Sequence, residues 1–113
     1  MGSGPRMTVT TVEVLQIFLA DAPRDRYGLE IMALTGLPSG TVFPILARFE
    51  GLGWLESGWE DVHPATVGRP QRRYYRLTGD GIKLAEEALA RVARAREKRR
   101  SMLRPAARSV GFS

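Results

Sequence analysis

The chain has 113 residues, about the length of one domain, of which 43% are hydrophobic and 26% are charged. It contains no cysteine and a single histidine, His63. This excludes disulfides, a thiolate nucleophile and a sulfur- or imidazole-rich metal site within one chain. No run of about 18 apolar residues is present, so no segment is predicted to span a membrane. We expect no metal, no cofactor and a cytoplasmic location.

Charge is distributed unevenly along the chain. The net charge is +5, but residues 1–68 hold four basic and eight acidic side chains, whereas residues 69–113 hold thirteen basic and four acidic ones. A basic C-terminal part indicates a polyanionic partner such as double-stranded DNA. A solvated basic tail that only keeps the protein soluble is the alternative that charge alone leaves open.

The N-terminal part of the chain combines a predicted leader with a predicted buried helix. Residues 1–7 have the composition of a cloning leader. From Thr8 the chain is strongly apolar until it reaches Asp21, which predicts a helix buried on most sides, although its β-branched residues also permit a strand. A polar turn over residues 24–26 follows. At the other end of the chain, residues 105–113 are expected to be disordered.

Two short helices with a tight connection are predicted next. Leu29, Met32 and Ala33, spaced i, i+3 and i+4, predict a helix that ends near Gly36. A second helix is expected over residues 39–52. Its apolar stripe consists of Val42, Ile45, Leu46, Phe49 and Leu52. Two short helices joined by a glycine-containing turn are the elements of a helix-turn-helix.

The hydrophobic period then changes from 3.6 to 2. Residues 55–60 and 72–77 alternate in polarity on either side of a loop over residues 61–70, which predicts a β-hairpin, the wing. Thr78 is expected to cap a final helix over residues 78–104, which would be about 40 Å long at 1.5 Å per residue. The predicted fold class is mainly α with a small β-hairpin: a winged helix-turn-helix domain over residues 8–77, followed by one long helix.

The final helix is longer than a domain of this size can cover. Its apolar stripe consists of Ile82, Ala85, Leu89 and Val92. We therefore expect this stripe to meet a second copy of itself and form a homodimer. Basic side chains surround the end of the helix, and their spread leaves no clean apolar face, which argues against binding flat on a membrane surface.

The second helix of a helix-turn-helix places its N-terminal residues at base edges in the major groove. The residues expected there are Ser39, which is also the expected N-cap, Gly40, Thr41, Val42, Pro44 and, one turn further, Arg48. Val42 also belongs to the apolar stripe, so pure packing is its alternative role. The alternative for Arg48 is an ion pair with Glu50 or Glu56.

Arginines in the wing are expected to contact DNA as well. Gly68 and Pro70 shape the turn so that Arg69 reaches a minor groove or a phosphate, and Arg72 lies nearby. A surface salt bridge is the alternative for any one of these arginines. By strand alternation Arg72 faces the side opposite to Arg73.

Four segments carry a family likeness. Residues 27–31, 40–50, 53–57 and 68–78 resemble the PadR-like transcriptional regulators, and the similarity covers about residues 12–90. The resemblance implies a dimeric DNA-binding repressor of the short form, with one C-terminal dimerisation helix. It also implies that Tyr27 lies close to the phosphate backbone, with a half-buried position in the core as its alternative role.

The remaining functional alternatives are narrow. No nucleophile–base–acid set can be assembled, so we expect no enzyme. Some family members sense flat aromatic compounds through aromatic side chains at the dimer interface, but residues 78–108 contain no aromatic. A small-molecule inducer therefore stays open without being indicated, with Phe18 as a candidate for such an interface. The alternative function is an interaction module that binds another protein, or nucleic acid without sequence preference.

Overall fold

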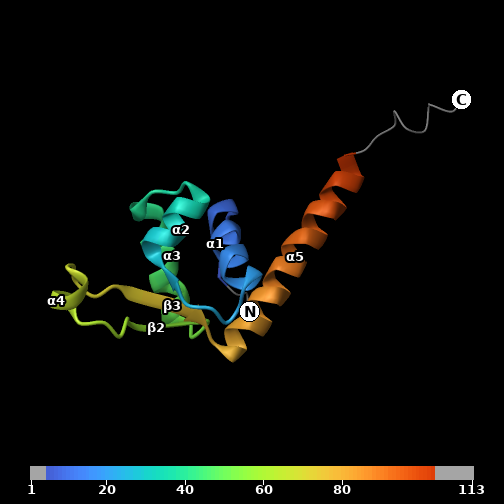
Figure 1. Cartoon of the computed structure of the whole chain (residues 1–113). Coiled ribbons are helices and arrows are strands. Elements are labelled where there is room, and N and C mark those ends of the chain that lie inside the picture. The colour runs from blue at the N-terminus through green and yellow to red at the C-terminus, as the bar shows by residue number, and fades with distance from the viewer. Residues whose placement is uncertain (1–4, 104–113) are drawn as a thin grey trace, which may run out of the picture.

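A computed structural model describes residues 5–103 (Figure 1). Three helices pack on one face of a small antiparallel sheet, a hairpin protrudes on one side, and the last helix leaves the body on the other side. Most of the expected leader and all of the expected tail lie outside the described residues, although Met7 packs against the core. The elements in chain order are α1 (Val9–Ala20), β1 (Arg26–Tyr27), α2 (Gly28–Thr35), α3 (Ser39–Gly51), β2 (Leu55–Trp59), α4 (Pro64–Val67), β3 (Arg73–Leu77) and α5 (Gly79–Leu103).

Helix α1 forms where the apolar run predicted it. Thr8 is its N-cap, and the Thr8 hydroxyl accepts a hydrogen bond from the backbone N–H of Thr11 at 3.2 Å. The strand that its β-branched residues permitted is not formed. Its buried residues are Thr11, Val12, Val14, Leu15 and Phe18.

Helix α2 ends as predicted but presents a different face to the core. The N–H of Gly36 donates to the carbonyl of Met32 at 2.8 Å, and Gly36 has a φ of 77°, a left-handed conformation that suits glycine at a helix C-terminus. The predicted apolar face was wrong, because Leu29 is 61% exposed whereas Ile31 is fully buried. Helical spacing shows which residues share a face. In a helix of only two turns, however, packing against α1 and α3 determines which face is buried.

Helix α3 follows the predicted stripe except at its two ends. Pro38, not Ser39, is the N-cap, because the Pro38 carbonyl accepts the N–H groups of Thr41 and Val42, both at 3.0 Å. Leu52 was predicted to be buried but is 51% exposed, since it follows the last helical residue and turns away from the core. The four buried residues are Val42, Ile45, Leu46 and Phe49.

The hairpin forms from the two predicted strands and gains a third strand. β2 and β3 pair from Leu55 opposite Leu77 to Trp59 opposite Arg73. β1 pairs with the other edge of β3, so the strand order is β1-β3-β2. Arg26 was predicted to lie in a polar turn but is the first residue of β1. It is only 7% exposed and forms an ion pair with Glu30 at an N–O distance of 2.7 Å. A two-residue strand has no periodicity from which it can be recognised.

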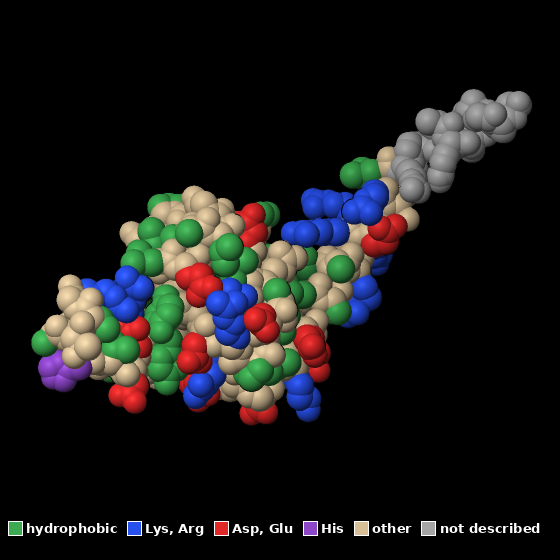
Figure 2. All heavy atoms as spheres, in the orientation of Figure 1, with side chains coloured by type: hydrophobic (Ala, Val, Ile, Leu, Met, Phe, Trp, Pro, Cys, Tyr) green, Lys and Arg blue, Asp and Glu red, His purple; other side chains and the backbone are tan. Residues whose placement is uncertain are grey.

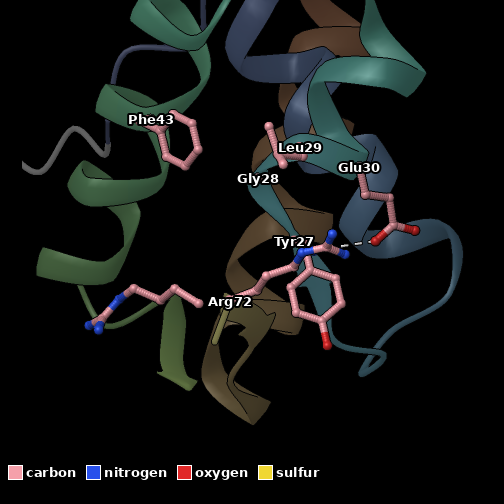
Figure 3. Close-up of a pocket in the computed structure, with 7 residues that line it drawn as sticks. Tyr27, Gly28, Leu29, Glu30, Phe43 and Arg72 are labelled. Atoms are coloured by element: carbon pink, nitrogen blue, oxygen red, sulfur yellow. Dashed lines mark hydrogen bonds between the residues drawn. The ribbon is translucent and has the colours of Figure 1, made fainter. Parts of the chain in front are cut away.

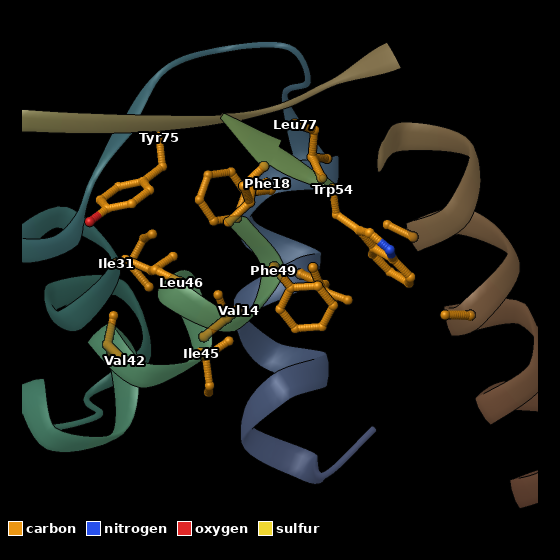
Figure 4. Packing of buried hydrophobic residues seen from close by; sticks show 14 residues of the cluster. Val14, Phe18, Ile31, Val42, Ile45, Leu46, Phe49, Trp54, Tyr75 and Leu77 are labelled. Carbon is orange, nitrogen blue, oxygen red and sulfur yellow. The ribbon is translucent and has the colours of Figure 1, made fainter. Parts of the chain in front are cut away.

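The core lies between the three helices and the inner face of the sheet (Figure 4). The rings of Phe49 and Trp54 meet at a centroid distance of 4.9 Å with a tilt of 56°, a geometry favoured by aromatic pairs. Leu77 reaches the same cluster from β3. This packing fixes α3 against the base of the hairpin, so the two elements expected to meet DNA are held by one core.

Helix α5 starts in this core and then projects away from it. Thr78 caps it as predicted, because its hydroxyl accepts the N–H of Gly81 at 2.8 Å. Ala85 and Ala88 are buried, but every side chain from Ala93 to Leu103 is exposed. Figure 2 shows basic side chains gathered along this projecting end. Within residues 5–103, no helix is both long enough and apolar enough to cross a bilayer.

Candidate nucleic-acid interface

The outer side of α3 presents the polar face that the sequence predicted. Ser39 and Gly40 are exposed at its N-terminus, Thr41 is half-buried, and Pro44 and Arg48 are exposed further along the helix. These residues follow one another at helical spacing on the side that faces away from the core. The face therefore combines backbone N–H groups of a helix N-terminus, a hydroxyl group and one guanidinium group, all of which bind nucleic acids.

Val42 does not belong to this outer face. Its side chain is fully buried in the core beside Leu46. The structure supports the packing role, which was the alternative for Val42, because a side chain without exposed surface cannot contact a base edge. We therefore leave Val42 out of the interface.

Arg48 is exposed and has no acidic partner within residues 5–103. The two glutamates considered as partners are engaged elsewhere. Glu50 accepts a hydrogen bond of 2.5 Å from the hydroxyl of Ser57 and lies 3.6 Å from Arg73, and Glu56 pairs with Arg76 at 3.0 Å. The guanidinium carbon of Arg48 lies 5.9 Å from the centre of the Phe49 ring. Its charge is therefore available to an external anion.

A groove of about 440 Å³ separates the start of α2 from α3 and the wing (Figure 3). Its walls are Tyr27, Gly28, Leu29, Glu30, Phe43, Arg72 and Arg73. A side chain at Gly28 would collide with the Phe43 ring, so this glycine allows α3 to approach the start of α2. The groove thus lies between Phe43 of α3 and the wing arginines Arg72 and Arg73.

The wing arginines fall into two groups. The guanidinium carbon of Arg73 lies 5.3 Å from the centre of the Trp59 ring, and Arg73 also contacts Glu50. Arg76 forms ion pairs with both Asp25 and Glu56. Arg72 is exposed, and its side chain has no ion pair within residues 5–103. The alternation predicted for β3 is confirmed, because Tyr75 and Leu77 are buried on the inner face.

Among the described residues Arg69, unlike Arg72, takes part in an ion pair. Its guanidinium binds the Glu60 carboxylate and the Pro70 carbonyl. The same carboxylate accepts the Tyr27 hydroxyl at 3.3 Å and the Arg72 backbone N–H at 2.9 Å. The hydrogen bond from Arg69 is the main cause that holds the pKa of Glu60 below its ordinary value. Burial, followed by the nearby Glu60 charge, raises the pKa of Tyr27.

The predicted dimerisation stripe divides into two parts. Ala85 is fully buried inside its own chain, so it is not exposed to a second copy. Ile82 and Leu89 are half-buried against the same core, whereas Val92 is half-buried just before the projecting end of α5. Leu84 is 39% exposed beside them. The apolar surface left for a partner therefore lies on the flank of α5.

The structure also bears on the expectations about an aromatic inducer and a metal ion. Phe18 is 1% exposed in the core, which removes it as an aromatic contact at a dimer interface. Among residues 5–103 no group of three or more His, Asp or Glu side chains is arranged to hold a metal ion. His63 is exposed and precedes α4, a four-residue helix within the expected loop.

Glu60 is a functional candidate that sequence reasoning missed, and Glu50 has other partners than the Arg48 that the sequence suggested. Both appear in the sequence as ordinary acidic residues, one at the end of a strand and one on a helix. Their partners lie between 7 and 33 residues away along the chain, so no local pattern reveals them. The only available signal was the presence of acidic residues close to a very basic wing.

Several solved structures of similar fold are PadR-type regulators. A PadR family transcriptional regulator from Eggerthella lenta is 19% identical, with a TM-score of 0.70 over 87% of this chain and 88% of that chain. A PadR family transcription regulator from Clostridium difficile is 22% identical, with a TM-score of 0.69 over 86% of this chain and 100% of that chain. A PadR-like transcriptional regulator from Bacillus cereus is 20% identical, with a TM-score of 0.65 over 87% and 94%. None of the curated proteins compared with the chain matches it in sequence.

The family signature extends over most of the described chain. The sequence pattern of the "Transcriptional regulator PadR-like family" matches residues 14–87, from α1 to the first half of α5. This range includes the helix-turn-helix, the wing and the groove between them. Members of this family are DNA-binding regulators and not enzymes. The chain belongs to the PadR-like family of transcriptional regulators.

Proposed function

We propose that this chain is a cytoplasmic, sequence-specific repressor that binds double-stranded DNA as a homodimer. The outer face of α3 enters the major groove, and the wing lies over the neighbouring backbone or minor groove. Two copies related by a two-fold axis read an inverted repeat, because dimer symmetry is mirrored in operator symmetry. A dimer placed over a promoter represses by excluding the polymerase.

The observation that carries this proposal is the difference in pairing among the arginines. Arg48 and Arg72 have no acidic partner within residues 5–103, whereas Arg73 and Arg76 are each held by carboxylates. Arg48 belongs to the outer face of α3, and Arg72 belongs to the groove wall. A protein gains little from leaving exposed guanidinium groups unpaired, but DNA phosphates and guanine edges are suitable partners for them.

Roles within the surface follow from side-chain chemistry. Thr41 donates to or accepts from a base edge, and Pro44 contacts a thymine methyl group. The N-terminal N–H groups of α3 at Ser39 and Gly40 favour a phosphate. Arg72 binds a phosphate beside the groove. Tyr27 and Arg69 border the same surface, where both are bonded to Glu60 and shape the surface that meets DNA.

The proposed dimer forms through α5. The exposed flank at Leu84 and the half-buried Ile82, Leu89 and Val92 provide a continuous apolar edge, and the helix continues about 16 Å beyond Val92 at 1.5 Å per residue. No flat aromatic surface accompanies this edge on α5, so the proposal includes no planar aromatic inducer.

Selection of bound fragments from genomic DNA by the purified protein, near physiological salt, tests the proposal. Specific and nonspecific affinities typically differ by about a thousandfold or more under these conditions. We expect fragments that share an inverted repeat with half-sites about one helical turn apart. Recovery without sequence preference would refute sequence-specific reading and favour a module for nonspecific nucleic acid or protein binding.

A further inference from the structure

The Glu60 carboxylate connects three segments that are far apart in the sequence. Its Oε2 accepts the Tyr27 hydroxyl at 3.3 Å, and Tyr27 is the last residue before α2. Its Oε1 accepts the Arg72 backbone N–H at 2.9 Å, and both oxygens face the Arg69 guanidinium. The side chain of Glu60 is only 9% exposed. We call these four residues the Glu60 cluster.

The position of the cluster coincides with the end of the supported sheet. β1 pairs with β3 only at Tyr74 and Tyr75, so the hairpin beyond Tyr74 has two strands and no third. A two-stranded hairpin is marginally stable on its own in water. Glu60 follows the last residue of β2 and also donates its backbone N–H to the Arg72 carbonyl at 2.9 Å. The cluster therefore fastens the wing where strand pairing stops.

A neighbouring contact extends this connection into the wing loop. The Gln71 side-chain amide donates to the carbonyls of Glu60 and Val62, both at 3.0 Å. The start and the end of the loop are thus tied together at its base. On the other side, the backbone N–H of Tyr27 is held by Glu30 at 3.3 Å, so Tyr27 is bonded through both its backbone and its hydroxyl.

A carboxylate is an unexpected group on a surface meant for DNA. Its negative charge opposes phosphate binding, and here it occupies the donors of Arg69 and Tyr27, which would otherwise be available to a phosphate. A residue that only adjusted surface charge would not be nine-tenths buried and bonded to three donor residues. The geometry therefore indicates a structural task linked to recognition.

We infer that Glu60 is a positioning residue, which fixes the wing against the start of α2 by bonding Tyr27, Arg69 and Arg72 at the same time. Because α2 packs against α3, the angle between the wing and α3 is fixed as well. The inference rests on the proposed function, since it assigns Glu60 a role in discriminating specific from nonspecific DNA. A preorganised wing meets one DNA geometry without losing conformational freedom on binding. A freely moving wing binds all sequences by charge alone.

The test compares Glu60→Ala with Glu56→Ala. The control removes the same charge from the neighbouring strand β2, where Glu56 is 52% exposed and outside the cluster. Binding to the selected operator and to a scrambled duplex is measured by fluorescence anisotropy. We expect Glu60→Ala to lower the operator-to-scrambled affinity ratio at least tenfold, with unchanged or tighter binding to the scrambled duplex. An equal ratio in the two variants would overturn the inference.

A second measurement needs no DNA and distinguishes a loosened wing from general unfolding of the variant. Hydrogen exchange at the Arg72 amide is followed by NMR in protein whose α3 amides keep their protection. We expect exchange at Arg72 to accelerate at least tenfold in Glu60→Ala and not in Glu56→Ala. Unchanged exchange at Arg72 in both variants would overturn the inference. If the wild-type protein shows no operator preference, the proposed function fails, and this measurement alone decides whether Glu60 fixes the wing.

Removal of one hydroxyl group shows whether the cluster acts as a unit. Tyr27→Phe deletes only the donor to Glu60, and we expect it to lower the affinity ratio by a part of the loss seen in Glu60→Ala. The double variant should lose no more than Glu60→Ala alone, because residues that act through one contact are not additive. Additive losses would show independent actions of Tyr27 and Glu60 and would contradict positioning through this bond.

Discussion

Gly81 lies directly against the backbone carbonyl of Trp54, so that a Cβ at position 81 would overlap that oxygen. The same carbonyl accepts the N–H of Thr78 at 2.9 Å. The start of α5 is thus fastened to the residue that precedes β2. This contact sets the direction in which α5 leaves the body, and with it the position of the flank proposed to meet a second copy.

We expect Gly81→Ala to lower the free energy of unfolding by about 1–3 kcal/mol, the typical cost of forcing an extra carbon into a packed site. Backbone atoms cannot move aside as a flexible side chain does. Gly79→Ala is the matched control, since nothing lies within 4 Å of a Cβ there. Urea denaturation measures both variants, and equal stability of the two would contradict the assigned contact.

Arg48→Ala should weaken binding to all DNA sequences or to the operator, and the salt slope tells which contact is lost. If Arg48 neutralises a phosphate, the slope of log affinity against log salt falls by about one unit. A loss confined to the operator indicates a guanine contact instead. Arg76→Ala is the control, because Arg76 already binds Asp25 and Glu56. Binding of Arg48→Ala that is indistinguishable from this control would remove Arg48 from the interface.

Thr41→Ala should affect specific binding more than nonspecific binding. Thr41 is half-buried near the start of α3, and loss of one base contact typically costs about 1–3 kcal/mol, or roughly fivefold to 150-fold in affinity. Anisotropy titrations with the operator and a scrambled duplex give the two affinities. Equal losses on the two duplexes would argue against a role in reading bases.

Val92→Asp should dissociate the dimer without unfolding the monomer. Val92 is half-buried at the end of the packed part of α5, whereas Leu89 contacts the core of its own chain and is less suited to this test. A carboxylate buried in an apolar interface without a partner is strongly unfavourable. Sedimentation should show a monomer for Val92→Asp and a dimer for Ala93→Asp, which changes an exposed neighbour. An unchanged dimer in Val92→Asp would place the interface elsewhere.

The free energy of unfolding should decrease at acidic pH, partly because Glu60 becomes protonated. The pKa of Glu60 is lowered in the folded protein, chiefly by the hydrogen bond from Arg69. The folded state therefore binds this proton more weakly than the unfolded state, and the stabilisation is present above the ordinary glutamate pKa of about 4.3 and is lost as the pH falls below it. Between pH 6 and 3, the wild type should lose more stability than Glu60→Gln in thermal unfolding. Parallel curves would mean that Glu60 does not contribute to the acid response.

The sequence was sufficient for the features that have a period. The α3 stripe, the two strands of the wing and the Thr78 cap each follow from local sequence and were predicted within one or two residues. Short elements escaped prediction because they have too few residues to show a period. β1 and α4 are examples, with two and four residues.

The candidate site was predictable in part for the same reason. The outer face of α3 follows from the opposite phase of its apolar stripe, so Thr41 and Arg48 were identified correctly as lying outside the core. Pairing of charges across the wing was not predictable, since Arg69 and Arg72 look equivalent in the sequence. Only the fold brings Glu60 to one of the two guanidinium groups and leaves the other unpaired.

Methylation interference on the selected operator tests the central claim, that α3 reads the major groove in a two-fold dimer. Methylation at guanine N7 changes the major groove, where the second helix of a helix-turn-helix contacts bases. For the wild type we predict two symmetric blocks of interference separated by one helical turn, about 10 base pairs. Both blocks should be absent in the double variant that combines Thr41→Ala with Arg48→Ala. Interference spread evenly along the fragment, or none at guanine N7, would contradict the account.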